Sequence, residues 1–201
     1  RDVLGSRGLG DVYKRQDLYC KMLNEAVKQL KGGTEEEIYT TVMDLNVDAY
    51  IPNSYIPNEY QKLDIYKRIA GIEDEEEMDD MLEELIDRFG DVPRKVQQLL
   101  QIAGLKALAH SAYVTAVEQK GEEFRFTMYE KAKVHPERIP KLIEDFRGEL
   151  TFKADGAQPC FIYEKKRRNL KEKQTDALEI TKNVLNGLKG LIGGEKSGII
   201  D

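Results

Sequence analysis

The sequence has few residues of the kinds that build metal centres and disulfide frameworks. It contains two cysteines and two histidines in 201 residues. Cys20 and Cys160 lie far apart and have no metal-ligand or redox spacing, which suits two structural thiols in a reducing compartment. His110 and His135 also lack a second His, a Cys or an acidic pair at ligand spacing. We therefore predict no metal site and no disulfide framework.

Long apolar runs and an excess of positive charge are missing as well. No apolar stretch approaches the roughly 18 residues of a membrane helix, and no charged-then-apolar leader is visible. The net charge is −6, so the chain as a whole is not attracted to nucleic acid or to an anionic membrane. Hydrophobic residues make up 40% of the chain, which is enough for a core. We expect a globular, cytoplasmic protein.

Motifs for nucleotide binding and hydrolysis are lacking. Gly8 and Gly10 are followed by no Lys-Ser or Lys-Thr and preceded by no strand, so they do not form a phosphate loop. The serine, cysteine and histidine residues form no nucleophile motif. The acidic run 73–80 lacks the alternating ligands and turn glycine of a calcium loop and indicates a solvated helix start. We predict that this chain is not an enzyme and holds no cofactor.

Hydrophobic periodicity predicts an α+β fold. Alternation predicts an extended run over 38–51, and two β-hairpins that pair 113–117 with 123–129 and 150–153 with 160–163. Three- and four-residue spacing predicts helices over about 58–71, 73–90, 93–108, 135–148 and from 169 to 188. Helices around two hairpins indicate a small antiparallel sheet packed with several helices.

Changes in pattern along the chain predict three parts. Residues 1–33 end at Gly32-Gly33, a plausible linker after a short helix that starts at Asp17. Residues 34–191 hold all the other periodic segments and form the predicted domain. Residues 192–201 are expected to be a frayed tail.

The stretch 73–90 predicts an amphipathic helix with both ends marked. Met78, Leu82, Leu85 and Phe89 recur at three- and four-residue steps, so we expect one buried apolar stripe. Acidic residues crowd the first turns, where the helix dipole favours them, and Gly90 is placed to end the helix.

Glu84, Asp87 and Arg88 fall on an arc of this helix that the stripe does not cover. We name these three residues the charged patch. Two interpretations are open from the residues alone: an ordinary exposed helix face with weak intrahelical pairing, or a surface that meets a partner.

A basic run, Lys165, Lys166, Arg167 and Arg168, follows the last predicted strand. Such a run is usually a solvated turn. Two aromatic residues precede it, which keeps phosphate or base contact open as an alternative function in nucleic-acid binding.

Three blocks in one order carry a family resemblance. They are DAYIPNSYIPNEYQKLDIYKRIA at 48–70, ELIDRFGDVP at 84–93 and LLQIAGLKALA at 99–109. With them, the chain from about residue 17 to 191 resembles the C-terminal part of bacterial transcription-repair coupling factors (Mfd). In that family the helix matching Asp17 trails the second RecA-like lobe of a DNA translocase, so residues 1–33 are interpreted as a remnant of that lobe.

The resemblance implies a parent protein that uses ATP to translocate on duplex DNA, displaces stalled RNA polymerase and recruits the excision-repair protein UvrA. The ATP and Mg sites would lie upstream of residue 1, so this chain would hydrolyse nothing by itself. The family's C-terminal domain packs on an N-terminal UvrB-like module and masks the UvrA-binding surface. Its contact helix matches Glu84, Asp87 and Arg88 here, with Phe89 behind them.

One segment departs from the family pattern. Residues 1–16 match its Gly-rich start only loosely and are shortened. We interpret them as disordered or artefactual and assign them no translocation role. The sequence thus predicts a non-catalytic regulatory domain that docks within its own polypeptide, with nucleic-acid binding through Lys165–Arg168 as the alternative.

Overall fold

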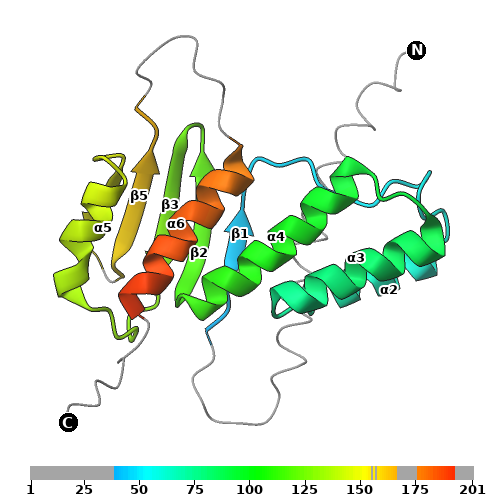
Figure 1. Cartoon of the computed structure of the whole chain (residues 1–201), viewed down its shortest axis with the longest axis horizontal. Coiled ribbons are helices and arrows are strands. Elements are labelled where there is room, and N and C mark those ends of the chain that lie inside the picture. Colours follow the sequence, from blue (N-terminus) through cyan, green and yellow to red (C-terminus); the bar gives the residue numbers. More distant parts are fainter. Residues whose placement is uncertain (1–38, 155, 157, 167–175, 193–201) are drawn as a thin grey trace, which may run out of the picture. The chain divides into compact units, whose positions relative to one another are not determined.

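The computed structural model describes residues 39–154, 156, 158–166 and 176–192. The predicted remnant 1–33, its boundary with the next part and the tail beyond Ile192 lie outside the described residues. Within them, the chain forms helices and a five-stranded sheet whose strand order is β1-β2-β3-β5-β4, which confirms the α+β prediction (Figure 1). The elements are β1 (Val42–Asp44), α2 (Glu59–Ala70), α3 (Glu75–Phe89), α4 (Arg94–Ser111), β2 (Val114–Lys120), β3 (Glu123–Met128), the 3-10 turn η1 (Pro136–Arg138), α5 (Ile139–Asp145), β4 (Leu150–Lys153), β5 (Cys160–Glu164) and α6 (Ala177–Ile192).

The chain divides into two compact units. In the described part, the first unit comprises 39–42 and 47–107, and the second comprises 43–46 and 108–192. This division runs inside the single predicted domain 34–191, and no composition shift or linker signal in the sequence indicated it.

The first unit is built from three helices. Helix α2 begins where predicted, because the side chain of Asn58 accepts hydrogen bonds from the backbone N–H groups of Tyr60 and Gln61 at 3.0 and 3.1 Å. Figure 1 shows α2 alongside α3. The core contains the fully buried Ile65 and Ile69 of α2. From the rest of the unit it also includes Ile51, Ile56, Met81, Leu85, Val96, Leu99, Leu100 and Ala103.

Helix α3 has an apolar stripe at the predicted place, but the prediction was wrong about which of its residues are most buried. Leu85 is fully buried, whereas Met78, Leu82 and Phe89 are only partly buried at the edges of the core. Met81 takes the centre instead. It lies one turn before Leu85, so a helix turning about 100° per residue brings the two side chains to the same side.

The second unit is built on the antiparallel strands β2, β3, β5 and β4. Both predicted hairpins form, β2 with β3 and β4 with β5. Gly121 has φ of +62° in the first turn, a backbone conformation that glycine adopts without steric cost. Strand β3 then pairs with β5, which joins the two hairpins into one sheet.

Alternation on the strands builds one buried face of this sheet. Phe126 of β3 lies opposite Phe161 of β5, and Phe124 lies opposite Tyr163. All four side chains are buried. Helix α6 lies across this part of the sheet in Figure 1 and buries an apolar stripe of its own. Its most buried residues are Val184, Leu185 and Leu188.

One predicted element is shorter than expected, and the predicted start of another is not described. The extended run 38–51 contributes only the three-residue strand β1, and Ile51 is buried without belonging to a strand. Helix α6 begins at Ala177, where the carboxylate of Asp176 accepts a hydrogen bond from the N–H of Leu178 at 3.1 Å. The predicted helix start near residue 169 lies outside the described residues.

Candidate functional site

The charged patch lies on the last two turns of α3. Hydrogen bonds at both ends of this helix fix where it begins and ends. The Asp74 side chain accepts a hydrogen bond from the N–H of Glu77 at 2.8 Å at the start of the helix. At the other end Gly90 has φ of +83°, and its N–H donates to the carbonyl of Ile86 at 2.9 Å. Buried Leu85 fixes the rotation of the helix, so the residues around it in sequence are turned toward the surface.

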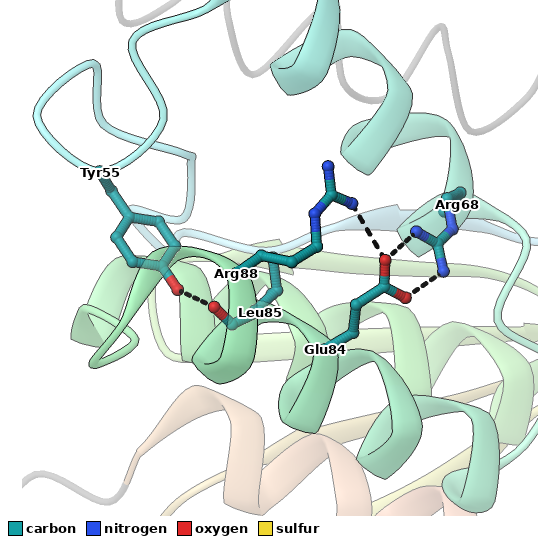
Figure 2. Close-up of polar contacts among 5 residues, drawn as sticks. All are labelled: Tyr55, Arg68, Glu84, Leu85 and Arg88. Atoms are coloured by element: carbon teal, nitrogen blue, oxygen red, sulfur yellow. Dashed lines mark hydrogen bonds and ion pairs between the residues drawn. The ribbon is translucent and has the colours of Figure 1, made fainter.

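Glu84 is held by two arginines (Figure 2). The guanidinium of Arg68, from α2, donates to Glu84 Oε1 from one nitrogen at 2.5 Å and to Oε2 from the other. Arg88, one turn along α3, donates to Oε1 at 3.0 Å. Both carboxylate oxygens therefore have a cationic partner, in the bidentate geometry that the planar guanidinium favours.

The electrostatic effect on Glu84 is large. Hydrogen bonding to Arg68 lowers its pKa from the usual value of 4.5 to about 2, against the opposing effect of burial, and Arg88 adds to the shift. The pKa of Arg68 rises, chiefly through the same hydrogen bond. At neutral pH this carboxylate is ionised and electrostatically compensated.

Asp87 and its neighbour Ile86 are in a different situation. The Asp87 side chain is exposed, and it makes no hydrogen bond or ion pair with any residue that the structure describes. Ile86 is 46% exposed, which is unusual for a large apolar side chain on a helix with a buried stripe. A free carboxylate and an exposed isoleucine are thus adjacent on α3.

Phe89 packs beside Arg88 and Tyr55 at the end of α3. Its ring is half-buried, lies 5.8 Å from the ring of Tyr55 and has the Arg88 guanidinium 5.0 Å from its centre. The Tyr55 hydroxyl lies 3.1 Å from the carbonyl oxygens of both Leu85 and Gly90, and its bond to Leu85 appears in Figure 2. The loop that carries Tyr55 is thereby attached to the end of α3.

The structure therefore changes the interpretation of the charged patch. Glu84 and Arg88 lie together as predicted, but Glu84 is bound by Arg68 and not free on the surface. Sequence reasoning missed Arg68, Tyr55 and Ile86. The pair Arg68–Glu84 spans 16 residues, and no helix-periodic signal links residues on two different helices.

The basic run is described only in part. Lys166 is exposed and its backbone N–H donates to Glu149 Oε1 at 3.3 Å, whereas Lys165 is half-buried. Arg167 and Arg168 lie outside the described residues. The nucleic-acid contact predicted for this run stays a prediction.

In the part of the chain that the structure describes, no group of three or more His, Cys, Asp or Glu residues is arranged to hold a metal ion. No helix among these residues is long and apolar enough to cross a membrane.

Comparisons with known proteins agree on one family. Residues 45–139 match the TRCF domain. The chain is 38% identical over 162 residues to a transcription-repair-coupling factor of Staphylococcus haemolyticus, with 75% of this chain and 13% of that protein aligned. It is 32% identical over 186 residues to the Bacillus subtilis transcription-repair-coupling factor, with 91% of this chain and 15% of that protein aligned.

A solved structure shares the fold. It is described as the C-terminal domain of a transcription-repair coupling factor and aligns with a TM-score of 0.60 at 24% identity, covering 77% of this chain and 94% of that one. The chain spans less than one sixth of the length of the two curated relatives above. The three blocks at 48–70, 84–93 and 99–109 all lie within the matched TRCF region, and the chain belongs to the TRCF domain family of transcription-repair coupling factors.

Proposed function

We propose that this chain is a non-catalytic regulatory domain that docks through α3 on an N-terminal UvrB-like module of the same polypeptide. Docking would mask the surface with which that module recruits UvrA. One observation carries the proposal: Asp87, which has no side-chain partner among the described residues, is the neighbour of the exposed Ile86 on the last turns of a firmly capped helix.

The mostly charged composition of this surface suits an interface from which the two modules must be able to separate. A large apolar interface would hold two modules together permanently, whereas modest polar interfaces allow domains to separate. Around the charged patch only Ile86 offers substantial exposed apolar area on α3, and the other contributors are charged. Glu84, Asp87 and Arg88, with Phe89 behind them, are the residues that we assign to the partner contact.

The parent polypeptide supplies the chemistry in this proposal. The relatives are named transcription-repair-coupling factors. We infer that the parent is an ATP-dependent DNA translocase that displaces stalled RNA polymerase during nucleotide excision repair. ATP and Mg would bind upstream of residue 1, and the chain described above would contribute no catalytic group. We place the protein in the cytoplasm, where its duplex DNA and polymerase partners are found.

Charge reversal tests the masking. Asp87→Lys and Glu84→Lys in the full-length parent should each increase UvrA binding, measured by pull-down with purified UvrA. Complete unmasking from a 1:99 to a 99:1 equilibrium needs about 5.5 kcal/mol, so single reversals should unmask partially, with a gain of about tenfold.

A matched control lies on the same helix. Asp79→Lys changes the charge by the same amount, but Asp79 is exposed two turns earlier and has no side-chain partner among the described residues. It should leave UvrA binding unchanged. Equal UvrA binding by the wild type, Asp87→Lys and Glu84→Lys would refute the masking role.

A further inference from the structure

Glu84 connects two helices of the first unit through one carboxylate. Arg68 comes from the last turn of α2, and Glu84 and Arg88 lie one turn apart on α3. Arg68 binds both oxygens, and Arg88 shares Oε1 with it (Figure 2). Two parallel N–H···O bonds from one guanidinium restrain the rotation of the Glu84 carboxylate as well as its distance. Arg68 therefore holds the carboxylate in one plane.

The cluster compensates the charge of Glu84 but not that of Asp87. Two guanidinium groups surround one carboxylate, and Asp64, one turn before Arg68, also stabilises the charged form of Arg68. The Glu84 charge is already compensated within the domain. Asp87, by contrast, has its charge unmatched by any described residue.

A purely stabilising role for this cluster would be small. The side chains of Arg68, Glu84 and Arg88 are 42%, 32% and 38% exposed. Ion pairs this open to water contribute little to folding, because solvent screens them and ordering long side chains costs entropy. The two helices are held together by the apolar core around Ile65, Ile69 and Leu85.

We propose that Arg68 is a positioning residue of the docking surface, which fixes Glu84 and, through Glu84, holds the guanidinium of Arg88 where the partner meets it. Arg88 is then presented in one orientation against the Phe89 ring, ready to donate its remaining N–H groups. Glu84 contributes to the partner contact mainly by holding Arg88, whereas Arg88 and Asp87 present their charges directly to the partner. This inference rests on the proposed function for the identity of the partner.

Substitutions at Arg68 separate its geometry from its charge. Arg68→Lys keeps the positive charge but loses the two parallel hydrogen bonds to Glu84. Arg68→Gln loses both the charge and this bidentate geometry. Lys67→Gln is the matched control, because Lys67 is the neighbouring exposed cation of α2 and has no side-chain partner in the described residues. Each variant would be made in the 201-residue chain, with urea unfolding to confirm that it folds.

The first readout is the affinity for the separately expressed N-terminal module of the parent. Arg68→Gln and Arg68→Lys should each weaken binding about fivefold, the size expected of a partly exposed charge-assisted pair. Lys67→Gln should bind as the wild type does. If Arg68→Lys binds as tightly as the wild type, or if Lys67→Gln weakens binding as much as Arg68→Gln, charge alone explains the effect and the positioning role is wrong.

The second readout needs no partner. In NMR spectra, Arg68→Gln should raise the titration midpoint of the Glu84 carboxyl from about 2 toward 4.5 and make the Arg88 Nε–H group more mobile. Arg68→Lys should restore part of the titration shift but not the rigidity of Arg88. Unchanged mobility of Arg88 in both variants would overturn the proposal.

The two readouts keep the two proposals distinguishable. If the wild-type chain does not bind the module while Arg88 becomes mobile in the Arg68 variants, the docking function fails and the positioning of Arg88 stands as a property of the domain. If the wild type binds, Asp87→Lys weakens binding and the Arg68 variants behave as the wild type, docking stands and positioning fails.

Discussion

Helices α5 and α6 approach each other at Gly187 so closely that a Cβ atom there would lie 2.6 Å from Cδ1 of Leu142. The ring of Phe146 would be 3.2 Å away on the same side. Leu142 is buried, and Phe146 packs edge-on against Tyr163 at 6.1 Å, so neither side chain can move freely. Glycine at this helical position allows the two helices to meet.

Gly187→Ala should therefore destabilise the chain although alanine is the better helix former. We expect overpacking of about 2 kcal/mol to outweigh a gain in helix propensity of about 1 kcal/mol. Urea unfolding followed by circular dichroism measures the difference. Gly190→Ala is the control, because a Cβ there meets nothing within 4 Å, and it should be neutral or stabilising. An alanine at 187 that is as stable as glycine would contradict the close contact.

Leu85 and Ile86 are neighbours on α3 with opposite environments. Leu85→Ala should cost about 3 kcal/mol of unfolding free energy, since it opens a cavity in the core cluster to which Val96 and Leu99 also belong. Ile86→Ala should change stability by no more than about 0.5 kcal/mol, because the side chain is largely in water. The same unfolding assay compares the two. Ile86→Ala should instead weaken docking on the N-terminal module.

Tyr55 and Tyr60 provide a second matched pair. Tyr55→Phe removes the hydroxyl that bonds to the carbonyls at the end of α3 and should cost about 1 kcal/mol. Tyr60 is 86% exposed, so Tyr60→Phe should be silent. Thermal or urea unfolding of the two variants decides this. Equal stability of both variants would mean that the Tyr55 hydroxyl adds nothing to the attachment of its loop.

The depressed pKa of Glu84 predicts the direction of a pH effect. In the unfolded chain this carboxyl takes up a proton as the pH falls through 4.5, whereas in the folded domain it stays ionised to about 2. Its contribution is therefore complete above pH 4.5 and is lost as the pH falls from there toward 2. The amount should be no more than ~1 kcal/mol, because the pair is partly exposed.

Unfolding of the wild type and Glu84→Gln at several pH values tests this. The wild type should be the more stable protein at about pH 6, and the difference should shrink as the pH falls toward the native pKa of Glu84. A difference that is independent of pH would show that Glu84 stabilises the fold by packing and not by charge.

Much of this protein could be predicted from local patterns. Asn58, Gly90 and the Lys120-Gly121 turn mark element ends through hydrogen bonds and backbone conformations that involve only nearby residues. Alternating apolar residues at 123–129 and 160–163 indicated the two hairpins for the same reason. The order of the elements and the α+β class followed from these signals alone.

Tertiary structure decided what distant residues do to one another. The pairing of β3 with β5 and the capture of Glu84 by Arg68 each join segments whose contact leaves no periodic trace in the chain. The charged patch shows this most clearly. Its position on a helix follows from spacing of 3.6 residues per turn, but whether each of its charges is free or bound depends on which neighbouring helix is packed against it, and only the folded core sets that.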